Sequence, residues 1–81
     1  MELEDYKDIF KDMLSSALYY EKIGNKHNNQ VIIDSIVRFK NQYSEALSVT
    51  NTDDAEAYYN ELRGELFECE EIIEEFNLDE E

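Results

Sequence analysis

The sequence predicts an all-α protein, built as a three-helix antiparallel bundle or as an open sheet of helices. Apolar residues recur at alternating steps of three and four along three segments, which is the spacing of one face of a helix. The 81 residues include no proline. Turn-forming polar residues gather at 24–29 and 50–53. Two breaks therefore separate three helices in one domain, residues 1–81, which is long enough for one modest core.

The first helix is expected over residues 2–23. Gly24 follows it and stands where a C-terminal cap belongs, because glycine adopts the left-handed backbone of such caps at little cost. Its apolar stripe consists of Leu3, Tyr6, Phe10, Met13, Ala17 and Tyr20.

The second helix is expected over residues 30–48, with Asn28 or Asn29 as its N-cap. It repeats the amphipathic pattern of the first helix. Its apolar stripe consists of Ile32, Ile36, Phe39, Tyr43 and Ala46.

The third helix is expected over residues 53–76, followed by an acidic tail at 77–81. Asp53 and Glu56 have the spacing of a capping box. Gly64 lies in the helix interior, where glycine is unfavourable, and it allows a kink, a close approach or a break that would give four helices. The apolar stripe consists of Ala55, Tyr59, Leu62, Leu66, Cys69, Ile73 and Phe76.

The apolar residues outnumber the positions of these three stripes. Because exposed contiguous apolar surface marks an interaction site, we expect self-association, most simply as a homodimer. A monomer with a broad core and a few exposed aromatic side chains is the alternative. The candidates for this dimer or secondary interface are Leu14, Leu18, Val37, Phe67 and Ile72.

The charge is strongly negative and unevenly distributed. The chain carries 21 acidic and 7 basic residues, a formal net charge of −14. Before Asp53 the acids are nearly balanced, whereas from Asp53 onward only Arg63 opposes 13 acidic residues. A field of this sign repels nucleic acid and anionic membranes and attracts basic protein surfaces. We therefore expect a basic protein partner, without direct binding of nucleic acid or membrane.

The third helix concentrates this charge in a ladder of neighbouring carboxylates. Residues three or four apart are neighbours on a helix, and a helix of this length extends roughly 36 Å, about one turn of duplex DNA. The pattern favours a carboxylate row that occupies a protein channel shaped for DNA; a solubilising acidic face is the alternative. The candidate partner-binding residues are Asp53, Asp54, Glu61, Glu65, Glu68, Glu71 and Glu75.

The residues that catalysis requires do not form a recognisable pattern. His27 lies in a predicted turn without metal-ligand spacing around it, and Cys69 lies on an apolar stripe, where free cysteine behaves as a small buried hydrophobe. Carboxylates on one exposed helix face cannot enclose a cation. We expect no enzyme activity, no catalytic residues, no metal site and no cofactor.

The sequence also carries expectations about location. No apolar stretch approaches the roughly 20 residues that span a bilayer, and residues 1–5 lack the basic start of a signal peptide. We expect a cytoplasmic protein, located in the host bacterial cytoplasm if it is viral.

In size, composition and acidic ladder the chain resembles the small acidic inhibitors of bacterial viruses, which imitate DNA and block host proteins that handle it. These phage proteins share no motif, so the resemblance transfers no residue role. It implies a basic DNA-binding target: a restriction nuclease, a CRISPR effector, a nucleoid protein, RNA polymerase or a sliding clamp. The alternative is a helical adaptor or antitoxin-like subunit that binds its partner through an apolar helix face.

Overall fold

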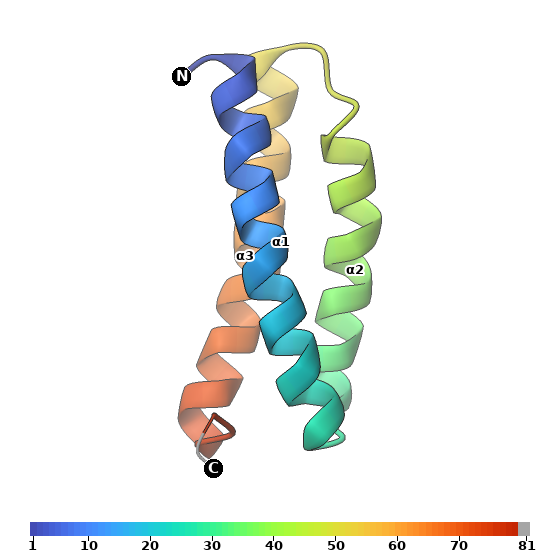
Figure 1. Cartoon of the computed structure of the whole chain (residues 1–81), viewed down its shortest axis with the longest axis vertical. Coiled ribbons are helices and arrows are strands. Elements are labelled where there is room, and N and C mark those ends of the chain that lie inside the picture. Colours follow the sequence, from blue (N-terminus) through green and yellow to red (C-terminus); the bar gives the residue numbers. More distant parts are fainter. Residues whose placement is uncertain (80–81) are drawn as a thin grey trace.

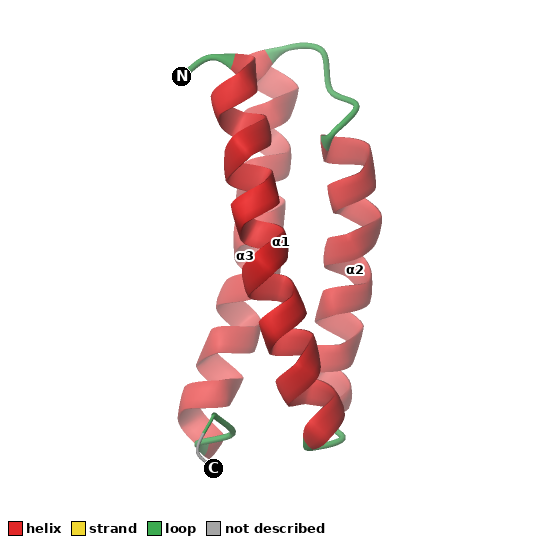
Figure 2. Ribbon diagram, viewed as in Figure 1, coloured by secondary structure: helices red, strands yellow, loops and turns green. Residues whose placement is uncertain are grey.

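Three helices run down, up and down along the long axis of the molecule, so that α2 is antiparallel to α1 and α3 (Figure 1). A computed structural model describes residues 1–79, in which α1 spans Leu3–Lys26, α2 spans Gln30–Ala46 and α3 spans Thr52–Phe76. Figure 2 shows helices joined by loops, without a strand among the described residues. Each helix contacts both of the others. The all-α prediction is confirmed, and the bundle is closed, not an open sheet.

The core forms where the three predicted stripes meet. Its largest fully buried apolar side chains are Phe10 from α1, Ile32, Ile36 and Phe39 from α2, and Leu62 from α3. Burial of one face per helix therefore accounts for the fold.

Phe76 departs from the predicted third stripe. It occupies the last turn of α3 and is 61% exposed. In Figure 1 the last turns of α3 diverge from α1, and the Phe76 ring is left largely in solvent although Ile73, in the same turn, is buried. Its placement in the core was wrong.

The end of α1 also differs from the prediction. Gly24 does not cap the helix, because α1 continues to Lys26 and Gly24 is buried inside it. The left-handed residue of this turn is Asn28, with φ 51°. Asn29 is the N-cap of α2, where its side-chain oxygen accepts a hydrogen bond of 3.1 Å from the Ile32 backbone N–H.

Gly24 instead permits close packing of α1 on α2. A Cβ atom at this position would lie 2.7 Å from Cγ2 of Ile32, closer than two carbon atoms pack. The glycine that sequence reasoning assigned to a helix end therefore serves a helix–helix contact.

The N-terminal cap of α3 also differs from the prediction. The N-cap is Asn51, whose side chain accepts from the Asp54 backbone N–H at 2.9 Å and donates to the Asp54 carboxylate at 3.0 Å. The predicted capping box of Asp53 and Glu56 was wrong by two residues. The end of α2 at Ala46 likewise precedes the predicted end at residue 48.

The helix α3 is continuous through Gly64, so the alternative of four helices is excluded. Asn77 caps its C-terminus with a left-handed φ of 53°. His27 Nε2 donates to the Leu78 carbonyl at 2.8 Å, which ties the turn after α1 to the chain beyond α3. Residues 80–81 of the predicted acidic tail lie outside the described residues.

Candidate functional site

The candidate site is the acidic surface of α3. The helix contains ten acidic residues and one arginine in 25 residues. At 1.5 Å per residue it extends about 37 Å without interruption. The predicted ladder therefore lies on one continuous helix that runs along the bundle, whose longest dimension is 40 Å.

The carboxylates of the ladder do not all point the same way. Glu71 and Glu75 lie on the side of α3 opposite the buried Leu62 and Ile73, because of their positions in the helical repeat. Glu61 is also exposed. Among residues 1–79, these three glutamates take part in none of the ion pairs. Glu71 and Glu75 form the outward-facing part of the predicted site, and Glu61 lies exposed at the side of α3.

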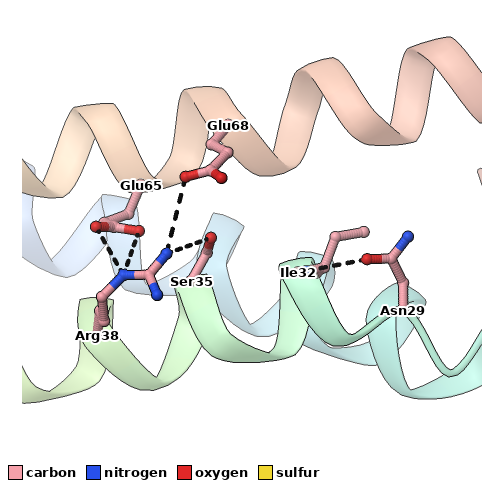
Figure 3. Close-up of polar contacts among 6 residues, drawn as sticks. All are labelled: Asn29, Ile32, Ser35, Arg38, Glu65 and Glu68. Atoms are coloured by element: carbon pink, nitrogen blue, oxygen red, sulfur yellow. Dashed lines mark hydrogen bonds and ion pairs between the residues drawn. The ribbon is translucent and has the colours of Figure 1, made fainter.

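Two ladder carboxylates turn toward α2 instead (Figure 3). Nε of Arg38 donates to both carboxylate oxygens of Glu65, at 3.2 and 3.3 Å, and Nη2 lies 3.8 Å from Glu68. Nη2 also donates to Oγ of the buried Ser35 at 3.1 Å. The hydrogen bond to Glu65 and its charge raise the pKa of Arg38. Part of the predicted row is thus neutralised within the chain.

Glu65 and Glu68 differ in how much of each side chain stays exposed to solvent beside Arg38. The Glu65 side chain is only 17% exposed, whereas Glu68 keeps about half of its surface in solvent. Sequence reasoning missed Arg38 as part of this surface. Its position midway along the second helix, opposite the middle of the third in an antiparallel pair, was the available signal.

The two predicted site residues at the start of α3 are placed for a local role. Asp53 and Asp54 occupy the first helical turn, where a negative charge is favourable next to unpaired backbone N–H groups. Asp54 is also engaged by the Asn51 cap. Both side chains remain exposed, about seven residues from the next ladder carboxylate, Glu61.

The predicted apolar interface is divided in the structure. Leu14 and Ile72 are partly buried and pack against the core. Leu18, Val37 and Phe67 are 47%, 52% and 57% exposed and belong to three different helices. Self-association through these residues stays a prediction.

A second carboxylate group lines a depression between α2 and α3. The hydroxyl of Tyr58 donates to Glu45 at 3.0 Å, which raises the pKa of Tyr58. Asp54 and Glu61 line the same depression. The negative surface of α3 thus extends around the helix toward α2 near Glu61.

Cys69 lies buried at the contact of α2 and α3. Burial raises the pKa of its thiol to about 11, against an opposing hydrogen bond from Ser35. At neutral pH the group is therefore a protonated thiol, which is a poor nucleophile. The structure places Cys69 in the core, as its stripe position predicted.

The raised pKa of Cys69 predicts a loss of stability at alkaline pH. Its thiol ionises more readily in the unfolded chain, so its contribution is complete below about pH 9 and is lost as pH rises to about 11. The expected loss is about 2–3 kcal/mol. Urea unfolding of wild type and Cys69→Ala from neutral to alkaline pH measures it. Tyr20 and Tyr58 titrate in both proteins, so parallel pH curves would contradict the assignment.

No helix in residues 1–79 is long and apolar enough to cross a membrane. No group of three or more His, Cys, Asp or Glu side chains in that range is arranged to hold a metal ion. The chain matches no protein-family model, no curated protein sequence and no solved structure. The candidate site therefore rests on its own geometry and charge.

Proposed function

We propose that this protein is a non-catalytic inhibitor that imitates DNA and occupies the basic nucleic-acid-binding channel of a bacterial DNA-handling protein. The observation that carries the proposal is the continuous α3, with ten acidic residues against one basic residue. A rigid row of like charges fits a basic channel without losing the conformational entropy that a flexible acidic tail would lose on binding.

The dimensions of α3 support the comparison with DNA. A helix of 25 residues extends about 37 Å, close to the 34–36 Å of one turn of duplex DNA. Neighbouring glutamates three or four residues apart lie roughly 5–6 Å from one another. This spacing is of the same order as that of successive phosphates along a DNA strand.

The ion pairs of Arg38 indicate which carboxylates meet the partner. Glu65 is held by Arg38 and mostly covered, so releasing it would expose an unpaired arginine. Glu61, Glu71 and Glu75 are exposed and can pair with a partner's lysines and arginines without that cost. We assign the main electrostatic contact to these three residues, with Glu68 contributing at its exposed side.

The test compares two triple variants of equal net charge. One variant carries Glu61→Gln, Glu71→Gln and Glu75→Gln, and the other neutralises exposed acids of α1, as Glu4→Gln, Asp8→Asn and Asp12→Asn. Each removes three negative charges, so the formal net charge changes from −14 to −11 in both. Only the first alters α3.

Wild-type protein on a solid support is expected to retain basic DNA-binding proteins from a bacterial lysate, and short duplex DNA or about 0.5 M salt is expected to release them. The α3 variant should retain at least about tenfold less, and the α1 variant should match wild type. Equal losses in both variants, or retention that duplex DNA does not reverse, would refute recognition by a DNA-like surface.

A further inference from the structure

The outer face of α3 carries a shallow depression at Gly64. Its lining residues are Asn60, Arg63, Gly64 and Phe67, which recur at helical spacing along one side of α3. A Cβ atom added at Gly64 would meet no other atom within 4 Å. Phe67, one turn further on, is 57% exposed. The backbone at Gly64 is thus open to solvent beside an exposed aromatic ring.

Neither residue serves the fold of this chain. Glycine within an exposed helix is less stable than alanine would be there. An exposed phenylalanine contributes little burial, unlike the buried Phe10 and Phe39. Gly24 provides the contrast, since a Cβ there would collide with Ile32. A surface depression next to an exposed aromatic ring is typical of a site that anchors a binding partner.

The surrounding charges decide what fits the depression. Exposed carboxylates of Glu61, Glu68 and Glu71 lie within about two turns of Gly64 on α3. A second copy of the chain, docked through the same face, would bring these acidic residues against their own equivalents. A basic partner meets opposite charges there. The occupant is therefore a cationic protein surface and not a second copy.

Arg63 restricts the group that enters the depression itself. Arg63 lines the depression, so its positive charge would repel a lysine or arginine side chain at the centre. An apolar side chain is not repelled, and it can pack on Phe67 and on the open backbone at Gly64. The positive charges of the partner then lie outside this centre, against Glu61 and Glu71.

We propose that α3 recognises a cationic protein segment with one apolar side chain at its centre, which enters the depression between Gly64 and Phe67. This inference rests on the proposed function, because it adds an apolar anchor to the same acidic face. Charge attracts the partner, and the anchor selects which basic partner stays bound once salt screens the charges.

Two synthetic peptides of equal length test the anchor, an oligolysine and the same peptide with one central leucine. Binding to the full chain is measured by calorimetry at about 0.05 M and about 0.5 M salt. For wild type, the leucine peptide is expected to bind about tenfold more tightly than oligolysine at high salt, because burial of one apolar side chain is worth that factor. Gly64→Leu and Phe67→Ala should each abolish this preference while leaving oligolysine binding at low salt unchanged.

Val37→Ala is the matched control, since it removes an apolar side chain of similar exposure from α2. It should leave the leucine preference intact. Thermal unfolding separates binding from folding, because Gly64→Leu is expected to raise the melting temperature while it weakens peptide binding. A parallel loss of stability and binding would overturn the inference.

The two proposals fail in different ways. If oligolysine binds wild type but not the Glu61, Glu71 and Glu75 variant, and leucine adds nothing, the anchor is refuted and the acidic site stands. If neither peptide binds wild type at low salt, both proposals fall. If Phe67→Ala keeps the full leucine preference, the depression is not the anchor.

Discussion

Replacing Phe39 with alanine is expected to lower the free energy of unfolding by about 3–5 kcal/mol. The ring is fully buried between the three helices and stacks on Tyr43, with ring centroids 6.0 Å apart. Its removal forfeits the transfer free energy of a whole aromatic side chain and leaves a cavity that a rigid bundle cannot close. Since small domains are stable by only about 5–15 kcal/mol, a large part of the stability would be lost.

Urea unfolding followed by circular dichroism measures this loss, with Phe76→Ala as the control. Phe76 is 61% exposed, so its truncation is expected to cost less than about 1 kcal/mol. Losses of similar size for both substitutions would mean that the last turn of α3 is as well covered as the centre of α2. The pair therefore also tests the correction to the predicted apolar stripe of α3.

The helices and most of the core could be predicted from sequence because apolar periodicity reports directly on burial. Ile32, Ile36 and Phe39 follow the helical repeat and are all buried. Phe76 follows the same repeat and is exposed, because periodicity identifies the face of a helix and does not show where its neighbours end. A stripe predicts burial only along the length that other helices cover.

The caps were less predictable because several residues near each helix end satisfy the same rule. Gly24 and Asn28 both tolerate a left-handed backbone, and the structure uses Asn28. Gly24 is instead required for the close contact between α1 and Ile32 of α2. This contact between helices is not visible in the local sequence of the turn. Tertiary packing selects among local alternatives that sequence treats as equal.

The candidate site was predicted as an acidic row on the third helix; α3 carries those carboxylates on one continuous helix, but Glu65 and Glu68 turn toward Arg38 of α2. The inward turn of Glu65 could not be predicted from α3 alone. It depends on the register between α2 and α3, which brings Arg38 within 3.2 Å of that carboxylate. The depression at Gly64 was also beyond sequence reasoning, since an interior glycine is equally compatible with a kink, a break or an open surface.

The second large effect is expected for Gly24→Ala. Helix propensity alone predicts that this substitution stabilises the protein, whereas the packing around Gly24 predicts that it destabilises the protein. Alanine stabilises a helix interior by about 1 kcal/mol relative to glycine. At Gly24 the added Cβ would lie 2.7 Å from Cγ2 and 3.1 Å from Cβ of Ile32, so α1 and α2 must separate or Ile32 must leave its rotamer. Overpacking of this kind costs about 1–3 kcal/mol. Gly24→Ala should therefore destabilise the protein by up to about 2 kcal/mol in urea unfolding, which is the overpacking cost less the gain in helix propensity.

Gly64→Ala is the matched control, because the same substitution in an open helix interior should stabilise the protein by about 0.5–1 kcal/mol. A double-mutant cycle then assigns the cause of the loss at Gly24. Ile32→Leu removes the β-branched methyl group that the new Cβ meets, so the cost of Gly24→Ala should shrink in its presence. If the two substitutions are additive, or if both glycines respond with the same sign, the close approach of α1 and α2 does not limit the residue at position 24.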